Sequence, residues 1–178
     1  MPWMRPGADT PFGFRPYDKI LRVRPYLKDA SEAAIYPGDV LIREAAGGVT
    51  VAGVSSTQIV GVAAEYSPAN TLKTDFLVYD HPEQLFYVQD DGEATAMTET
   101  HTGMNVDLIT TTGDTVTLQS LHELDANTAA VTAGLACKVI ALHEMEGRNF
   151  ATTTGQPRKW VVMFNAHIYR DVVGQTGI

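Results

Sequence analysis

Residues 78–93, VYDHPEQLFYVQDDGE, place one histidine and five carboxylates within sixteen positions. These are the side chains that bind metal ions and transfer protons near neutral pH. However, the flanking runs Phe76–Tyr79 and Leu85–Val88 are rich in aromatic and branched residues, which favour strands. Asp80 and Pro82 between them are turn formers. We therefore interpret the segment as two paired strands joined by a turn, with its charges in solvated loops.

The other acidic and histidine residues do not have the spacing of a metal site. After Asp90–Glu93, the sequence Ala94-Thr95-Ala96 supplies almost none of the further oxygen ligands that calcium needs. His122-Glu123 and His143-Glu144 are adjacent pairs on predicted strands, so the two side chains of each pair point to opposite faces. A zinc site that joins His122 and His143 across two strands remains an alternative to two ordinary histidines. We predict no metal and no cofactor.

Nucleophilic catalysis has equally little support in the sequence. Gly53–Thr57 lacks the second glycine of a G-x-S-x-G elbow, and Cys137 begins an apolar run, where a small core residue is expected. The sequence has no glycine-rich motif of the kind that cradles phosphate. We predict that the protein is not an enzyme and has no catalytic residues.

Composition limits the partners. Thirteen Lys and Arg against twenty-one Asp and Glu give a net charge of −8, which repels phosphate backbones and anionic membranes. No apolar run approaches the roughly 20 residues of a membrane-spanning helix. We therefore expect neither a nucleic-acid nor a membrane partner. Basic residues nevertheless gather near the start of the chain, at Lys19, Arg22, Arg24 and Lys28.

From Tyr36 onward the chain consists of short strand-like runs bounded by Gly, Pro, Asp or Asn. We predict an all-β fold, a β-barrel or β-sandwich of about eight to nine short strands, with little helix. One short helical turn is expected near Gly103–Leu108. The expected strands are Val40–Arg43, Val49–Ala52, Ile59–Ala64, Phe76–Tyr79, Leu85–Gln89, Thr115–Leu124, Lys138–His143 and Trp160–Tyr169.

The first residues have a different character from the rest. Residues 1–18 contain four prolines among aromatic residues, which excludes a helix and disfavours a central strand. We predict an extended N-terminal arm and lead-in over residues 1–35, a β-barrel body over 36–178, and a body that folds without residues 1–18. The aromatic groups need a host surface, on this body or on another subunit. The predicted partner-binding residues are Trp3, Phe12, Phe14, Arg15 and Tyr17.

Five short motifs carry a resemblance to a known group of proteins. They are Gly13-Phe14-Arg15-Pro16, the run Tyr36–Leu41 (YPGDVL), Gly48–Ala52 (GVTVA), Ile59–Ala63 (IVGVA) and Asn165–Arg170 (NAHIYR). In their order along the chain they resemble the capsid decoration, or cement, proteins of tailed bacteriophages. Residues 93–135 match nothing in that group, and we interpret them as an outward-facing elaboration.

The resemblance implies a structural virion protein on the outer surface of an expanded capsid. Members of the group are β-rich, commonly trimeric, and tie neighbouring major capsid protein subunits together, often with a terminal arm. It therefore implies a homotrimer, the major capsid protein as partner, and capsid stabilisation as the function.

Three alternatives remain. The first is a minor head or tail-associated structural protein. The second is a barrel enzyme that would use His81, His122, His143 and Glu144. The third is a module that binds a small ligand or glycan, for which Tyr79, Phe86, Tyr87 and Trp160 are candidates, although a place in the core suits these aromatic residues better.

Overall fold

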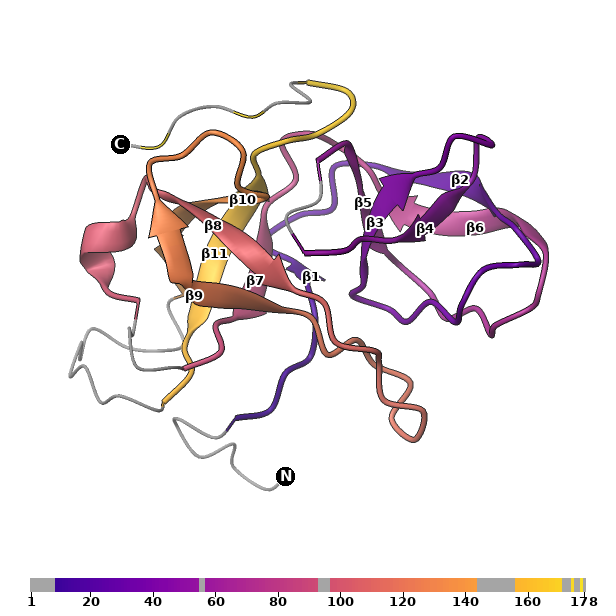
Figure 1. Cartoon of the computed structure of the whole chain (residues 1–178), viewed down its shortest axis with the longest axis horizontal. Helices are drawn as coiled ribbons and strands as arrows, with labels where there is room; N and C mark the ends of the chain where they lie inside the picture. Colours follow the sequence, from indigo (N-terminus) through magenta and orange to yellow (C-terminus); the bar gives the residue numbers. More distant parts are fainter. Residues whose placement is uncertain are drawn as a thin grey trace.

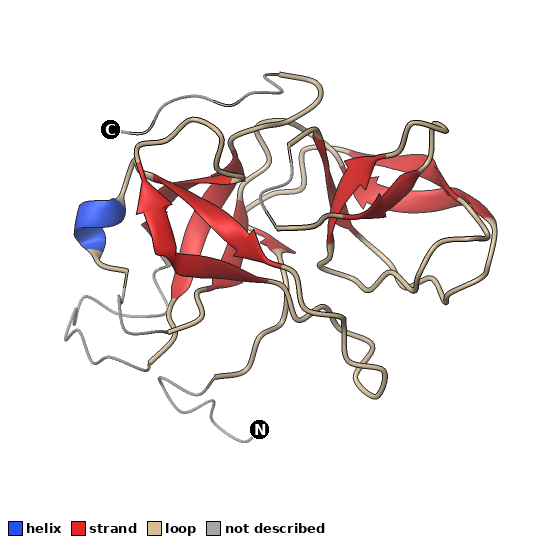
Figure 2. Ribbon diagram, in the orientation of Figure 1, coloured by secondary structure: helices blue, strands red, loops and turns tan. Residues whose placement is uncertain are grey.

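The computed structural model describes residues 9–54, 57–92, 97–143, 156–170, 174 and 177 (Figure 1). The described residues form eleven strands and one 3-10 turn, η1, at Glu99–His101 (Figure 2). All strand pairs in the two sheets are antiparallel, and the sheets form a sandwich-like arrangement rather than a closed barrel. The prediction of an all-β fold is confirmed.

Sheet A has six strands in the order β1-β7-β11-β10-β8-β9. It curls, because a single bridge from Asp90 to Leu124 and a hydrogen bond from Asp91 N to Leu124 O (3.1 Å) bring the start of β9 back to the end of β7. Its strands are β1 (Arg15–Pro16), β7 (Phe86–Gln89), β8 (Asn105–Ile109), β9 (Glu123–Ala130), β10 (Cys137–Leu142) and β11 (Lys159–Phe164).

Sheet B has five strands in the order β2-β6-β5-β3-β4. All five residues of β5 are buried, so Gly61 at its centre has no room for a side chain: a Cβ there would lie 2.0 Å from Tyr79 O. The strands of sheet B are β2 (Val23–Lys28), β3 (Val40–Arg43), β4 (Val49–Val51), β5 (Ile59–Ala63) and β6 (Lys73–Tyr79).

The chain builds sheet B between two neighbouring strands of sheet A. β1 pairs with β7 at Arg15↔Tyr87, and the whole of β2 to β6 lies between them in the sequence. The chain crosses between the sheets twice, after β1 and after β6, and the Gln84 side chain joins these two segments. It accepts a hydrogen bond from Leu21 N (2.8 Å) and donates one to Lys19 O (3.1 Å). The predicted arm and lead-in, residues 1–35, thus supplies one strand to each sheet.

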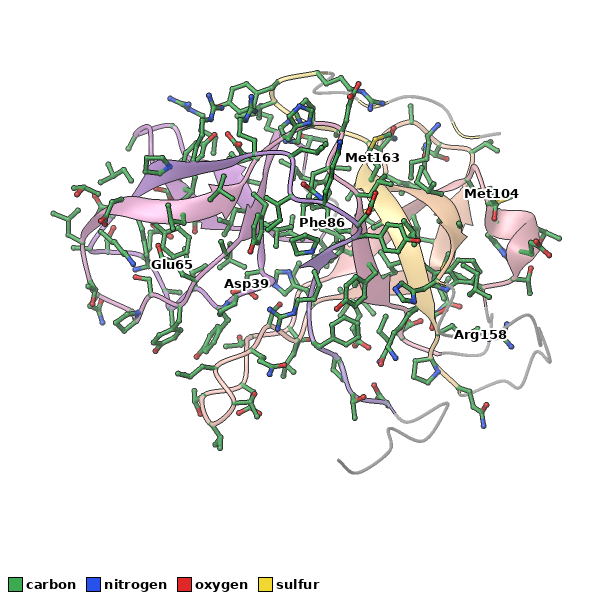
Figure 3. The ribbon with its side chains drawn as sticks, turned by 180° about the vertical axis from the view of Figure 1, so that it is seen from behind. Asp39, Glu65, Phe86, Met104, Arg158 and Met163 are labelled. Carbon is green, nitrogen blue, oxygen red and sulfur yellow. The ribbon has the colours of Figure 1, made fainter. Side chains whose placement is uncertain are left out.

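The main core is formed mostly by residues of sheet A, joined by a few from sheet B. Phe14, Phe86, Trp160 and Phe164 pack in one buried cluster with residues of sheet B such as Val62. A second cluster, which includes Leu41 and Phe76, fills the other face of sheet B. Figure 3 shows Asp39 and Phe86 near the middle of the molecule, between Glu65 on the sheet B side and Arg158 on the sheet A side.

The structure corrects the predicted hairpin in residues 78–93. The strands exist, but β6 pairs with β2 and β5 in sheet B, whereas β7 pairs with β1 and β11 in sheet A. The segment between them is a crossing between sheets. Asp80 and Asp90 are therefore buried rather than in solvated loops.

Three further local predictions are wrong in whole or in part. Residues 105–109 form strand β8 rather than a helical turn, and the 3-10 turn lies just before them. Residues 110–120 do not begin a strand but form a protruding loop between β8 and β9 (Figure 1), in which Val116 is 88% exposed. The final predicted strand also ends early, at Phe164.

Candidate partner-binding site

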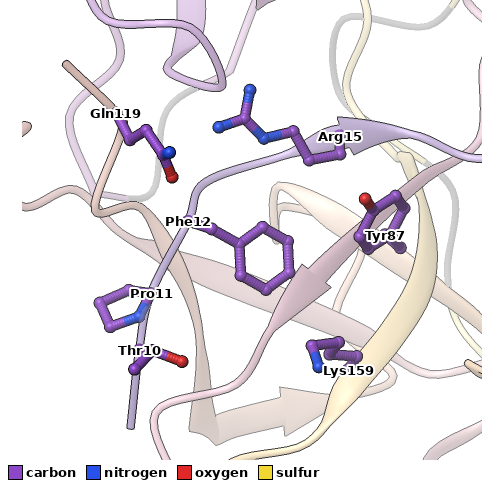
Figure 4. A pocket seen from close by; sticks show the side chains of 7 residues that line it. All are labelled: Thr10, Pro11, Phe12, Arg15, Tyr87, Gln119 and Lys159. Carbon is purple, nitrogen blue, oxygen red and sulfur yellow. The ribbon is translucent and has the colours of Figure 1, made fainter. Parts of the chain in front are cut away.

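A groove of about 500 Å³ opens beside the N-terminal segment, where that segment runs along β7 (Figure 4). It contains two of the predicted partner-binding residues, Phe12 and Arg15. The Phe12 ring is turned toward Tyr87 and Lys159, whereas the Arg15 side chain extends toward the Gln119 side (Figure 4). The groove is lined by Thr10, Pro11, Phe12, Arg15, Tyr87, Gln119 and Lys159.

A row of rings forms the apolar part of this surface. Phe12 contacts Tyr87, with ring centroids 5.5 Å apart, and Tyr87 contacts His143 at 5.0 Å. Tyr17 closes the row from the other side, at 5.5 Å from His143. The structure thus brings Phe12 and Tyr17 together on one surface through two residues that the sequence did not associate with the arm.

Phe14 lies elsewhere. Its side chain has no exposed surface, and its ring contacts Phe86 and Phe164 in the main core. Gly13 makes this reversal possible with a φ of +71°, and a Cβ at Gly13 would lie only 2.4 Å from Ser120 Cβ. Phe14 therefore anchors the segment and does not contact a partner. Deleting residues 1–18 would remove a core ring and β1, so we now expect the truncated body to be destabilised rather than unaffected.

Two cations border the groove. Arg15 has no ion pair or side-chain hydrogen bond with any described residue, although it is partly buried. Lys159 Nζ lies 6.0 Å from the centroid of the Phe12 ring. Because cations beside aromatic faces attract anionic and aromatic groups, the groove suits a partner side chain of either kind.

The main chain of this segment is already paired. Phe14 N donates to Gly38 O (3.0 Å), Tyr17 N donates to Leu85 O (2.8 Å), and Pro16 has no N–H. The outer edge of β1 therefore cannot readily add a strand from another protein, although β1 is an edge strand of sheet A. Binding here has to use side chains.

Gln89 fixes the start of the described segment. Its amide nitrogen donates to Asp9 Oδ1 (3.1 Å) and to Glu123 Oε1 (2.9 Å), and its oxygen accepts from Thr10 N (3.4 Å). Burial, together with the nearby charge of Asp9, raises the pKa of Glu123 to about 7. The groove is thus held by polar contacts at one end and by Phe14 at the other. Trp3, the remaining predicted partner-binding residue, lies outside the described residues.

The histidines considered for catalysis have separate local contacts. His81 Nδ1 accepts from Glu83 N (3.1 Å), His143 packs between Tyr17 and Tyr87, and Glu144 lies outside the described residues. His122 is buried, accepts from Val40 N through Nδ1 (3.2 Å), and places Nε2 3.5 Å from Asp39 Oδ1. The structure therefore does not bring the three described histidines together at one centre.

Asp39 and His122 form a buried pair with opposite pKa shifts. Burial raises the pKa of Asp39 to about 6 and lowers that of His122 to about 4. At neutral pH the pair is a carboxylate beside a neutral imidazole. With Nδ1 as the acceptor, the proton is on Nε2, so His122 cannot offer Nε2 to a metal ion in this arrangement. Within the described ranges, no three His, Cys, Asp or Glu side chains are placed to share a metal ion.

Sequence reasoning missed two buried carboxylates. Asp90 accepts from Arg158 N (2.7 Å) and from Trp160 Nε1 (2.9 Å). Asp80 lies beside the start of β2 and accepts hydrogen bonds from Arg22 and Arg24. The available signal was the alternation Arg22, Arg24 and Tyr26, which places three polar side chains on one face of a strand.

Comparisons with known proteins give no relative. No family model, no curated protein and no solved structure matches this chain. In the part of the chain that the structure describes, no helix has the length and apolar character needed to cross a membrane. Cys137 is buried, as expected for a core residue, and burial raises the pKa of its thiol.

Proposed function

We propose that this chain is a structural protein of a phage virion that binds the outer surface of the capsid and bridges major capsid protein subunits, with the groove beside Phe12 and Arg15 as its contact site. The observation that carries the contact site is a partly buried arginine without a described partner, next to two partly exposed rings. Arginine and aromatic residues dominate binding hot spots.

The capsid as host surface rests on the sequence resemblance. The motif Gly13-Phe14-Arg15-Pro16 forms the turn and first strand that set the groove, so the resemblance and the candidate site coincide in these residues. A protein that binds only the assembled shell stabilises it by mass action, and many copies add their effects. A homotrimer on the virion surface would present three copies of the groove in one bound assembly.

Co-sedimentation with purified capsids that lack this protein tests the proposal. Phe12→Ala and Arg15→Gln should each weaken binding about tenfold, because each removes a hot-spot group. The matched controls Leu72→Ala, just before β6, and Arg43→Gln, in β3, change exposed residues away from the groove and should bind like the wild type. Wild-type protein that stays in the supernatant at every concentration would rule out the capsid as partner.

The copy number separates the two structural alternatives. Quantitative mass spectrometry of density-purified particles should give about one copy per shell subunit for a decoration protein. A few copies per particle would instead indicate a minor head or tail-associated protein. The same groove also has a volume typical of small-ligand sites, so loss of a bound compound in Phe12→Ala without any capsid binding would favour a ligand-binding module.

A further inference from the structure

We propose that Arg22, Arg24 and Tyr169 form a second docking site, on sheet B, for an exposed carboxylate of a partner protein. These three side chains, which we call the arginine patch, belong to β2, the segment before it and the segment after β11. The patch does not involve the groove, and the inference does not rest on the capsid proposal.

Asp80 holds both arginines in place from below. It has no exposed surface, and it accepts from Arg22 Nε through Oδ1 (2.7 Å) and from Arg24 Nε through Oδ2 (2.5 Å). Tyr26 also donates to Oδ2 (2.7 Å). Because one buried carboxylate fixes two guanidinium groups, the patch is ordered before any ligand arrives, and less side-chain entropy is lost on binding.

Each guanidinium group keeps hydrogen-bond donors available for a ligand. Arg22 Nη2 donates to Asp80 O (2.9 Å) and Arg24 Nη2 donates to Tyr26 Oη (3.2 Å). Neither Nη1 group has a partner among the described residues. The side chains are 34% and 42% exposed, so these donors can reach solvent or a ligand.

Tyr169 forms an aromatic floor beside the two cations. The guanidinium carbon of Arg24 lies 4.8 Å from the centroid of its ring, and that of Arg22 lies 5.6 Å away. Tyr169 is 44% exposed and its hydroxyl lies 2.8 Å from that of Tyr26. Ring and cations together resemble the composition of an interface hot spot.

Charge decides the chemistry of the partner. Two arginines against one aspartate leave one unit of positive charge in the patch, on a chain whose net charge is −8. Parallel guanidinium donors recognise carboxylates and phosphates alike. The acidic chain as a whole repels a polyanion such as nucleic acid, whereas a single carboxylate avoids most of that repulsion. A glutamate, an aspartate or a C-terminal carboxylate of a protein therefore fits best.

Side-chain NMR can test the patch in the intact chain. The probe is a short peptide with two glutamates and one phenylalanine, acetylated at its N-terminus and amidated at its C-terminus, compared with its glutamine counterpart and with single-stranded DNA. The glutamate peptide should shift the Nε–H signals of Arg22 and Arg24 and the ring signals of Tyr169, with at least tenfold weaker binding of the glutamine peptide. Equal binding of both peptides, tighter binding of DNA, or no shift at millimolar peptide would overturn the proposal.

Variants provide the second readout. Tyr169→Ala and Arg24→Gln should weaken glutamate-peptide binding about tenfold, and Arg43→Gln, which removes an exposed charge elsewhere on sheet B, should leave it unchanged. Arg24→Gln also removes a partner of Asp80, so its folding is checked by thermal unfolding, and Tyr169→Ala tests the patch without touching that ion pair. Unchanged binding by Tyr169→Ala and by folded Arg24→Gln would contradict the assignment.

Discussion

Phe12 and Phe14 are two residues apart, yet their rings lie on opposite faces of β7. Phe12 contacts Tyr87 on the outer face, and Phe14 contacts Phe86 in the core. Tyr87 and Phe86 are neighbours in one strand, so their side chains point in opposite directions. The N-terminal segment therefore wraps around the strand, with one aromatic residue as anchor and the other available to a partner.

This arrangement predicts different costs for two similar substitutions. Phe14→Ala should lower the free energy of unfolding by about 3–5 kcal/mol, because it leaves a cavity in the main core. Phe12→Ala should cost about 1 kcal/mol or less, since the ring is only partly buried. Urea denaturation measures both. Equal losses in the two variants would mean that the segment is not anchored as described.

Substituting Asp80 should lower the free energy of unfolding more than is usual for a residue in a polar loop. Asp80→Asn removes the charge that two arginines share and places an amide donor against one of them, which we expect to cost about 2 kcal/mol. The value lies below that of a fully buried pair because the arginines are partly exposed. Glu83→Gln, three residues later and exposed, is the control and should be silent in the same denaturation experiment.

The buried pair of Asp39 and His122 should give opposing pH effects. Asp39 has a folded pKa of about 6, above its ordinary 3.8, so its contribution to stability is present below pH 3.8 and is lost as pH rises through 6. His122 has a folded pKa of about 4, below its ordinary 6.5, so its contribution is present above pH 6.5 and is lost as pH falls through 4.

Single variants should separate these two effects. Between pH 6.5 and pH 4, Asp39→Asn should lose stability on acidification more steeply than the wild type, and His122→Gln less steeply. Each difference should be on the order of 1–3 kcal/mol across the range. Chemical denaturation at several pH values measures the slopes. Identical slopes in all three proteins would show that neither group titrates in this range.

Gly61 should not tolerate a side chain. In Gly61→Ala the new methyl group would collide with Tyr79 O, and the φ of +154° is unfavourable for alanine, so we expect a loss of several kcal/mol or no folded protein. Gly47→Ala is the control: it has a positive φ of +98° but open space around it, and should cost only about 1 kcal/mol. Soluble expression and thermal unfolding distinguish the two.

The sequence predicts the local strands well and their partners poorly. Runs such as Val40–Arg43 are bounded by turn residues, and the structure has β3 at the same residues. The strands with which β6 and β7 pair could not be predicted from the sequence. An apolar run before a turn looks the same whether the chain turns back or crosses to another sheet. β8 was missed because four of its five residues are buried, so the alternation of a half-exposed strand is absent.

Only part of the candidate site could be predicted from the sequence, for a similar reason. The composition of residues 1–18 drew attention to Phe12 and Arg15, which line the groove, but nothing local shows that Phe14 turns inward. That depends on Gly13, which has a φ of +71° and packs against Ser120, a residue distant in sequence. The arginine patch depends in the same way on Asp80, which is distant in sequence from both arginines.

The insertion of sheet B between β1 and β7 has a consequence for how the chain acquires its structure. During synthesis, β1 emerges first but has no partner until Tyr87 has been made, whereas residues 23–79 contain all the strands of sheet B. We expect nascent sheet B to form while β1 is still unpaired, and the closing of β1 on β7 to come late, as a slow step dominated by distant contacts. The aromatic segment that we assign to partner binding would then stay unpaired at least until β7 has been made, and until that moment it would be exposed to chaperones and to neighbouring copies alike.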